Sequence, residues 1–211
     1  MHIVASVQAR LGSTRLPGKV LYHLENRRLL QWAVDRPTAA DKIDETVVTI
    51  GDQPENDAIT EFCERTEIPY NIGPEENLLT RHLNVTSQTN SDLLVRITAD
   101  CPFVPTSEIS RLIQLHLSND ARYTTNGVEE MPIGTAVDVI NEQVLEELKD
   151  FSLGCQVALR FKRFREAVFE PFTVALPAAG CCFSGWIGFV VGGSVVSHWV
   201  GLAVEVVGSC G

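Results

Sequence analysis

The chain has 211 residues, which is enough for one sizeable hydrophobic core and leaves little room for a second full domain. Hydrophobic residues make up 45% of the chain and charged residues 21%, a composition that excludes a disordered or a fibrous protein. The net charge of −10 argues against binding to DNA, RNA or anionic lipid, because each phosphate contact needs Lys or Arg. A small phosphorylated ligand held by a few local cations remains compatible with this charge.

Short apolar runs alternate with helix-like stretches over the first 150 residues. We expect strands at residues 3–7, 46–50, 93–98, 123–125 and 137–140. We expect helices at residues 29–34, 57–66, 78–87, 108–117 and 142–148. This alternation predicts an α/β fold, with a Rossmann-like, mostly parallel sheet and flanking helices. In such sheets ligands bind beyond the carboxyl ends of the strands, so the residues directly after each strand are the candidates for function.

The first strand leads into a loop at residues 8–19 that is rich in cations and glycine. Its cations are Arg10, Arg15 and Lys19, and its glycines are Gly12 and Gly18. Glycine lets a backbone approach a ligand closely, arginine grips phosphate oxygens with forked donors, and lysine adds a mobile point charge. In a chain with a net negative charge, we expect this cluster of cations to bind a polyphosphate. The alternative is a solvated surface loop without a ligand.

The spacing within this loop excludes two common nucleotide motifs. A Walker A loop has four residues between its glycines and Ser or Thr after its lysine. Here five residues separate Gly12 from Gly18, and Val20 follows Lys19. The loop also lacks the G-x-G-x-x-G pattern of dinucleotide sites, so it predicts a phosphate site of another kind.

The segment from Gln8 to Leu21 resembles the N-terminal signature of the cytidylyltransferase family, which includes the acylneuraminate and KDO cytidylyltransferases. The branch that it resembles most is that of the spore-coat polysaccharide biosynthesis proteins. In this family the loop wraps the triphosphate of CTP, and the fold is of the nucleotide-diphospho-sugar transferase type. The resemblance implies that Arg10, Arg15 and Lys19 neutralise phosphate charge, and that Gly12 and Ser13 supply backbone and hydroxyl donors.

Residues 92–103 resemble the same branch, and here a buried strand delivers Asp100 to its carboxyl end. A carboxylate opposite a phosphate loop suits Mg²⁺, a hard cation that prefers carboxylate, water and substrate phosphate. The alternative for Asp100 is a helix N-cap or a turn residue. Arg96 lies within this strand, where a charge is costly unless it is paired or faces a ligand. We interpret Cys101 as a small packing residue, because no partner base is identifiable.

Residues 123–126 and 132–140 resemble the next two blocks of the family. The family has an acidic residue on a short strand where this chain has Asp138, which implies a second metal carboxylate that faces Asp100 across the ion. The alternative is a strand-edge charge that points to solvent. Ala136 stands where the branch often has another aspartate, which leaves the number of metal ligands open.

Residues 49–57 and 73–81 match the family in layout, and Arg81 resembles the arginine that begins the following helix. Asp57 opens a predicted helix, where a carboxylate complements the helix dipole, so a structural role suits it at least as well. The resemblance covers about residues 2–148. It implies a nucleotide-binding set that consists of Ala9, Gly12, Ser13, Arg81 and Arg96.

The implied function is transfer of CMP from CTP to a sugar acid or a related sugar, with release of pyrophosphate. Mg²⁺ is the implied cofactor, a homodimer is the implied assembly, and surface polysaccharide or glycoconjugate biosynthesis is the implied context. Two alternatives stay open: a sugar-phosphate nucleotidyltransferase that uses another nucleoside triphosphate, and an inactive nucleotide-binding remnant. A glycosyltransferase is a weaker rival, because the chain has no Asp-x-Asp motif.

Residues 171–211 carry only one Asp, Glu, Lys or Arg side chain, Glu205. We therefore divide the chain into a nucleotidyltransferase domain at residues 1–150, a continuation of undetermined structure at 151–170, and an apolar tail at 171–211. The tail has three interpretations: a non-native C-terminus such as a shifted reading frame, packed strands, or a membrane segment. Insertion of this tail is the one route to a membrane that the sequence offers.

The six cysteines of the chain show no C-x-x-C pair and no zinc spacing. The first apolar run is interrupted by Arg10, which argues against a signal peptide. Together these features predict a reduced, cytoplasmic setting.

Overall fold

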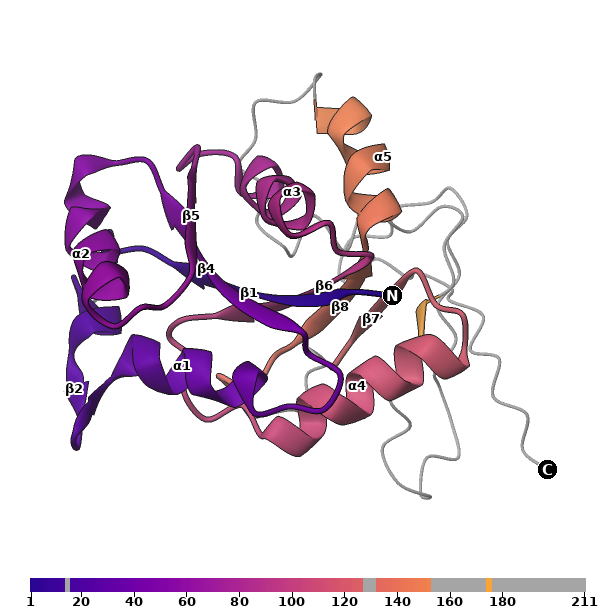
Figure 1. Cartoon of the computed structure of the whole chain (residues 1–211), viewed down its shortest axis with the longest axis horizontal. Coiled ribbons are helices and arrows are strands. Elements are labelled where there is room, and N and C mark those ends of the chain that lie inside the picture. Colours follow the sequence, from indigo (N-terminus) through magenta and orange to yellow (C-terminus); the bar gives the residue numbers. More distant parts are fainter. Residues whose placement is uncertain (14–15, 127–131, 153–173, 176–211) are drawn as a thin grey trace, which may run out of the picture.

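The computed structural model describes residues 1–13, 16–126, 132–152 and 174–175. A central sheet of seven strands has the order β5-β4-β1-β6-β8-β7-β9 (Figure 1). The strands are β1 (Ile3–Ala9), β4 (Glu45–Gly51), β5 (Tyr70–Gly73), β6 (Leu93–Thr98), β7 (Tyr123–Thr125), β8 (Asp138–Asn141) and β9 (Val174–Ala175). A separate two-stranded sheet pairs β2 (His23–Leu24) with β3 (Arg27–Arg28).

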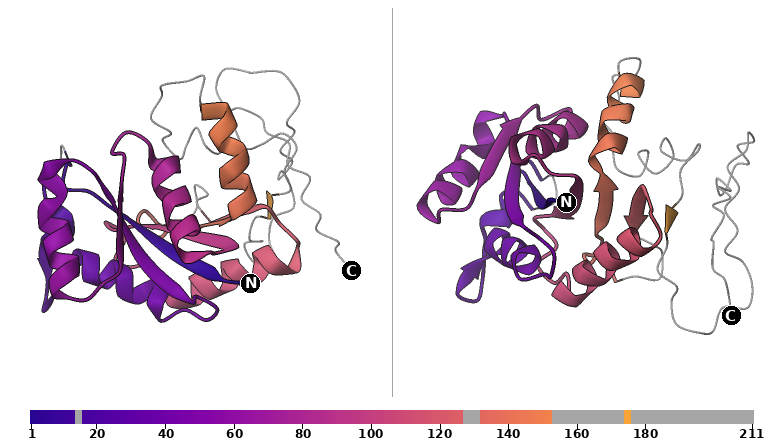
Figure 2. Two further views of the ribbon diagram at one scale, coloured as in Figure 1. Left: turned by 45° about the horizontal axis from the view of Figure 1, so that its top comes forward. Right: turned by 45° about the vertical axis from the view of Figure 1, so that its right-hand side comes forward.

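Helices cover both faces of the central sheet, as the two views in Figure 2 also show. One face carries α3 (Leu78–Thr89) and α5 (Glu142–Ser152). The other face carries α1 (Leu29–Thr38), α2 (Asp57–Arg65) and α4 (Thr106–Ser118). Two short 3-10 helices, η1 (Lys19–Leu21) and η2 (Pro54–Asn56), lie in the connections that follow β1 and β4.

Four neighbouring strands are parallel: β5 pairs with β4, β4 with β1, and β1 with β6. Gln8 of β1 lies beside Thr49 of β4 and Thr98 of β6, so the carboxyl ends of these strands meet at one edge. β8 runs antiparallel to both of its neighbours, β6 and β7. The predicted mostly parallel sheet with flanking helices is confirmed, and β8 is its antiparallel member.

The alternation of side chains along β1 supplies both halves of the core, because successive residues of a strand point to opposite faces. Val4 packs with Leu83 and Leu145 beneath α3 and α5. Ala5 packs with residues on the α4 side, among them Ile113. Each side of the sheet therefore buries an apolar layer under its own helices, and this burial is the main favourable contribution to folding.

Several elements differ from the pattern expected from the sequence, among them β5 and α1. β5 was not predicted, because Tyr70–Gly73 is not a continuous apolar run; it pairs with β4 at the edge of the sheet and leaves Ile72 exposed. α1 continues past its predicted end at residue 34 to Thr38, with Pro37 inside it. Pro37 lies in the last turn, where its missing N–H removes one i→i−4 hydrogen bond, and the helix ends one residue later.

Part of the apolar tail belongs to the described residues. Val174 and Ala175 form β9, which pairs in parallel with Tyr123 and Thr124 of β7. Residues 153–173 and 176–211 lie outside the described residues. The three interpretations of the tail therefore stay predictions. Within the described ranges, no helix has the length and apolar character that crossing a bilayer requires.

A buried histidine links α3 to the sheet. His82 is fully buried, and its Nδ1 atom lies 3.0 Å from the Ser6 hydroxyl of β1. Burial holds the pKa of His82 well below its ordinary value, and the positive charges of Arg96 and Arg81 lower that pKa further. His82 is therefore neutral in the folded protein at pH values where an exposed histidine takes up a proton.

This difference predicts a pH-dependent stability. As the pH falls below about 6.5, the unfolded chain protonates His82 while the folded chain does not, so the free energy of unfolding decreases. Urea unfolding at about pH 7.5 and about pH 5.5 should differ by about 1 kcal/mol from this residue. His116, whose pKa burial also lowers, contributes in the same direction.

The His82→Asn variant retains a polar group toward Ser6 and should lose the His82 contribution to this pH dependence. The matched control is His23→Asn, at an exposed position, which should keep the wild-type dependence. The same acid sensitivity in wild type and His82→Asn would contradict the assignment.

Candidate active site

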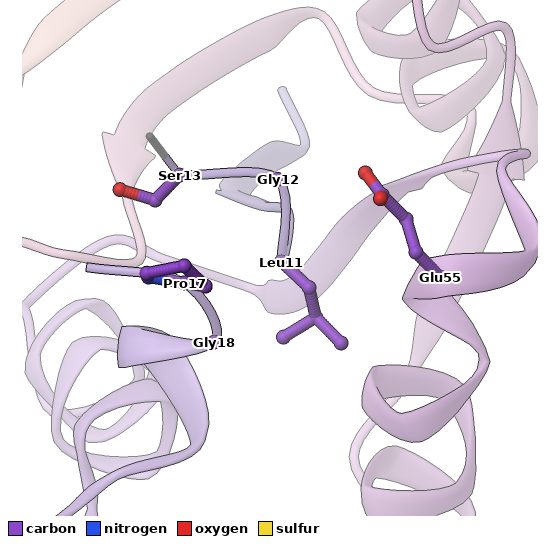
Figure 3. Close-up of a pocket in the computed structure, with 6 residues that line it drawn as sticks. All are labelled: Leu11, Gly12, Ser13, Pro17, Gly18 and Glu55. Carbon is purple, nitrogen blue, oxygen red and sulfur yellow. The ribbon is translucent and has the colours of Figure 1, made fainter. Parts of the chain in front are cut away.

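The carboxyl edge of the parallel strands carries the loop after β1, the turn after β4 and the turn after β6. A cavity of about 650 Å³ lies at this edge (Figure 3). It is lined by Leu11, Gly12, Ser13, Pro17, Gly18 and Glu55. Figure 3 shows the Glu55 side chain on the opposite wall from the loop. The volume falls within the range of about 300–1,000 Å³ that is typical of small-molecule sites.

The loop after β1 closes on the backbone of Leu11. The Leu11 carbonyl accepts hydrogen bonds from the Ser13 amide at 2.7 Å and from the Gly18 amide at 3.0 Å. Gly18 has a φ of 70°, in the left-handed region, where a Cβ atom would be strained. The requirement for glycine at position 18 therefore comes from the conformation that closes the loop and starts η1.

Lys19 and Asp100, both predicted for the site, are in direct contact. Lys19 Nζ lies 2.5 Å from Asp100 Oδ2, and both side chains remain partly open to solvent, at 29% and 40% exposure. Burial raises the pKa of the Asp100 carboxyl, but hydrogen bonds with Lys19 and Thr98 and the Lys19 charge outweigh this effect. The pKa of Asp100 therefore lies below its ordinary value, and the carboxylate is ionised.

The residues at this edge fit a Mg²⁺ ion that is held mainly by a substrate. Within the described ranges, no group of three or more His, Cys, Asp or Glu side chains forms a metal site. Mg²⁺ commonly uses only one or two protein carboxylates and completes its shell with water and substrate phosphate. Asp100 offers such a carboxylate beside the loop after β1.

Asp138 lies in a buried polar cluster on the sheet. Its Oδ2 atom accepts a hydrogen bond from Arg96 Nη1 at 2.8 Å, and its Oδ1 atom accepts one from the Tyr123 hydroxyl at 2.6 Å. Arg96 Nη2 also donates to Gln8 Oε1 at 3.1 Å. Asp138 is 1% exposed, so the alternative of a strand-edge charge facing solvent is wrong. Its role as a metal ligand stays a prediction.

Arg81 is buried at the start of α3, against the end of β5. It is 2% exposed, and a Cβ atom on Gly73 would lie 2.9 Å from Arg81 Cγ. Its Nε and Nη1 atoms have no hydrogen-bond partner among the described residues. Burial lowers the pKa of Arg81, the nearby Glu75 carboxylate opposes this effect, and Arg10 adds to it. Arg81 thus keeps unused donors within electrostatic range of Arg10, in the loop after β1.

The other predicted residues occupy different environments. Ala9 ends β1 and its side chain is packed in the core, so any contact with a ligand would come from its backbone. Arg10 is exposed at the edge, while Arg15 lies outside the described residues. Arg96 is ion-paired, as a charge within a strand requires. Cys101 is buried, and burial raises the pKa of its thiol, in keeping with a packing residue.

Asn56 is a site residue that the sequence pattern did not reveal. It is 1% exposed at the end of η2, and its side chain contacts Leu11, Gly51 and Glu75. The sequence feature that could have identified Asn56 is its position shortly after the end of a strand, β4. The same feature identified Asp100, which follows β6. A Pro-Glu-Asn segment is typical of turns. The sequence therefore favours a turn residue at Asn56 and gives no indication of its hydrogen bonds to distant segments.

Sequence comparisons relate this chain to known proteins. The model of the family described as Cytidylyltransferase matches residues 4–150. The spore coat polysaccharide biosynthesis protein SpsF of Bacillus subtilis is 32% identical over 151 residues, which are 69% of this chain and 62% of that protein. A 3-deoxy-manno-octulosonate cytidylyltransferase of Idiomarina loihiensis is 27% identical over 166 residues, which are 77% of this chain and 62% of that protein. The chain thus spans about three-fifths of the length of these curated relatives.

Solved structures share the fold. A cytidylyltransferase from Leptospira borgpetersenii has a TM-score of 0.72 at 22% identity, over 83% of this chain and 74% of that one. The CMP:2-keto-3-deoxy-manno-octonic acid synthetase complexed with CTP has a TM-score of 0.63 at 14% identity, over 83% of this chain and 89% of that one. With the family match over residues 4–150 and the SpsF similarity, the chain belongs to the cytidylyltransferase family.

Proposed function

We propose that the chain transfers CMP from CTP to a sugar acid or a related sugar and releases pyrophosphate. The observation that carries this proposal is the contact of Lys19 with Asp100 beside a loop that closes on Leu11. The arrangement brings a cation for phosphate and a carboxylate for a metal to one point of the sheet edge. The names of the relatives, a spore coat polysaccharide protein and a 3-deoxy-manno-octulosonate cytidylyltransferase, support CTP and a sugar acid as substrates.

In this proposal the loop holds the triphosphate. Gly12 and Ser13 line the cavity and offer close backbone approach and a hydroxyl group. Arg10 and Lys19 neutralise phosphate charge, and Arg15 does the same by resemblance to the family. The buried donors of Arg81 suit acceptor atoms of the nucleotide, because an unpaired guanidinium gains most from a partner that enters with the ligand.

Asp100 is the residue that we propose to hold Mg²⁺, with Asp138, whose oxygens accept bonds from Arg96 and Tyr123, as a second ligand. A bound Mg²⁺ would neutralise charge on the phosphates and stabilise charge that develops during transfer. Without ligand, Lys19 neutralises Asp100. A triphosphate gives Lys19 a stronger anionic partner, which frees the Asp100 carboxylate for a cation.

The proposed chemistry is in-line attack of an acceptor hydroxyl on the α-phosphorus of CTP, with pyrophosphate as the leaving group and the hydroxyl proton lost to solvent. Lys19 and the arginines stabilise charge on the departing pyrophosphate. Such a reaction depends mainly on positioning and on preorganised electrostatics. A cytoplasmic homodimer is part of the same proposal, by resemblance to the family.

Loss of either partner of the Lys19–Asp100 pair should remove most of the activity. We expect Lys19→Ala and Asp100→Ala each to lower Mg²⁺-dependent pyrophosphate release from CTP by about 10²–10³-fold, as removal of one preorganised group does. The assay couples pyrophosphate to a colorimetric phosphate readout, with a panel of sugar acids as acceptors. Near-native turnover by either variant would show that the site assignment is wrong.

The matched controls are Lys42→Ala and Asp41→Ala, at exposed positions between α1 and β4. They make the same changes of charge and volume away from the loop, so they should retain wild-type turnover. A loss of similar size in these controls would indicate a general effect of surface charge.

The choice of nucleotide is testable by thermal shift. Wild type with Mg²⁺ should be stabilised more by CTP than by UTP or GTP, because a ligand that binds only the folded state raises Tm. At a concentration of about 100 Kd the gain is about 2.7 kcal/mol. A larger shift with UTP or GTP would favour a sugar-phosphate nucleotidyltransferase, and a CTP shift without pyrophosphate release would favour the inactive remnant.

A further inference from the structure

Asn56 connects residues that lie at or just after the ends of three different strands. Its Oδ1 atom accepts a hydrogen bond from the Leu11 amide, in the loop after β1, at 2.8 Å. Its Nδ2 atom donates to the carbonyl of Gly51, the last residue of β4, at 3.0 Å, and to Glu75 Oε2, after β5, at 3.1 Å. The amide thus uses its acceptor and both of its donors while it is buried, an arrangement that an aspartate carboxylate cannot make.

Leu11 lies at the start of the loop after β1, which we propose to hold the triphosphate. The hydrogen bond to Asn56 fixes the planar Arg10–Leu11 peptide group, and with it the position of the Leu11 Cα atom, from which the next peptide group, with the Leu11 carbonyl, begins. That carbonyl accepts the Ser13 and Gly18 amides and so closes the loop. Asn56 therefore restrains the loop at the residue whose carbonyl accepts two of the hydrogen bonds within the loop.

The second contact of Asn56 is with the segment between β5 and α3. The Glu75 carboxylate lies over Gly51, since a Cβ atom there would be 1.5 Å from Glu75 Oε2. The Glu75 amide donates to Asp52 Oδ1 at 3.0 Å, which fixes the same segment a second time. The negative charge of Glu75 raises the pKa of Arg81. Because Asn56 donates a hydrogen bond to Glu75, it also links the loop after β1 to the surroundings of the Arg81 guanidinium.

We infer that Asn56 is a positioning residue that holds the nucleotide loop in its binding conformation before the ligand arrives. The inference deepens the proposed function and rests on it. A loop that is ordered in advance loses less conformational freedom on binding, so the same contacts give a higher affinity. Asn56 acts through Leu11 and Glu75, and no contact of Asn56 with the nucleotide is required.

The test combines hydrogen exchange with kinetics on the full chain. In Asn56→Ala the Leu11 amide loses its acceptor, and we expect its exchange rate to rise about tenfold in the free protein, with the amides of β6 unchanged. The same variant should raise KM for CTP by about tenfold and change kcat by less, because bound triphosphate can reorder the loop. A purely structural role would lower the active fraction, and so kcat, with KM unchanged.

Asn56→Asp is the second variant, and it is used alone if Asn56→Ala does not fold. It keeps an acceptor for the Leu11 amide but loses both donors and places a second carboxylate beside Glu75, so Leu11 should stay protected while KM rises. Asn119→Asp, an exposed position at the end of α4, makes the same chemical change and should match wild type in both measurements.

The outcomes separate the inference from the proposed function. If wild type releases pyrophosphate from CTP and both Asn56 variants keep its KM, the inference is overturned and the proposed function stands. Unchanged exchange of Leu11 in Asn56→Ala also overturns it. If wild type neither binds nor converts CTP, the proposed function fails and takes with it the role of Asn56 in nucleotide binding.

Discussion

The pairing of Lys19 with Asp100 depends on β1 and β6 lying side by side in parallel, because these two strands deliver the two residues to the same edge. A shift of register by one residue would turn the side chains of β6 toward the opposite faces of the sheet and displace the turn that carries Asp100. The register is fixed by the apolar layers on both faces, including Val4 on one and Ala5 on the other. The chemistry at the edge is thus specified by the packing of the core.

Much of this arrangement could be predicted from the sequence, because apolar periodicity marks strands and helices, and parallel strands bring their ends together. Lys19 and Asp100 were predicted to share a site on this ground, and they are in contact. β5 was not predictable by the same means, since an edge strand has a weak apolar pattern. The contacts of Asn56 were also missed, because three hydrogen bonds to distant segments leave no local signal.

The cluster of Gln8, Arg96, Asp138 and Tyr123 provides charge balance within the sheet rather than at its edge. Its members come from β1, β6, β8 and β7, so it ties the parallel strands to the antiparallel one. Removal of one member of a buried ion pair leaves an uncompensated charge, which typically costs about 3–5 kcal/mol. Asp138 therefore contributes to the stability of the sheet whether or not it also binds a metal ion.

The position of β8 between β6 and β7 has a consequence for synthesis on the ribosome. β7 leaves the ribosome before β8, yet its strand partners in the structure, β8 and β9, both come later in the chain. Until residues 138–141 emerge, one edge of β6 has no hydrogen-bonding partner strand, and β7 has neither of its partner strands. Unpaired strand edges of this kind are the segments that chaperones shield from association with other nascent chains.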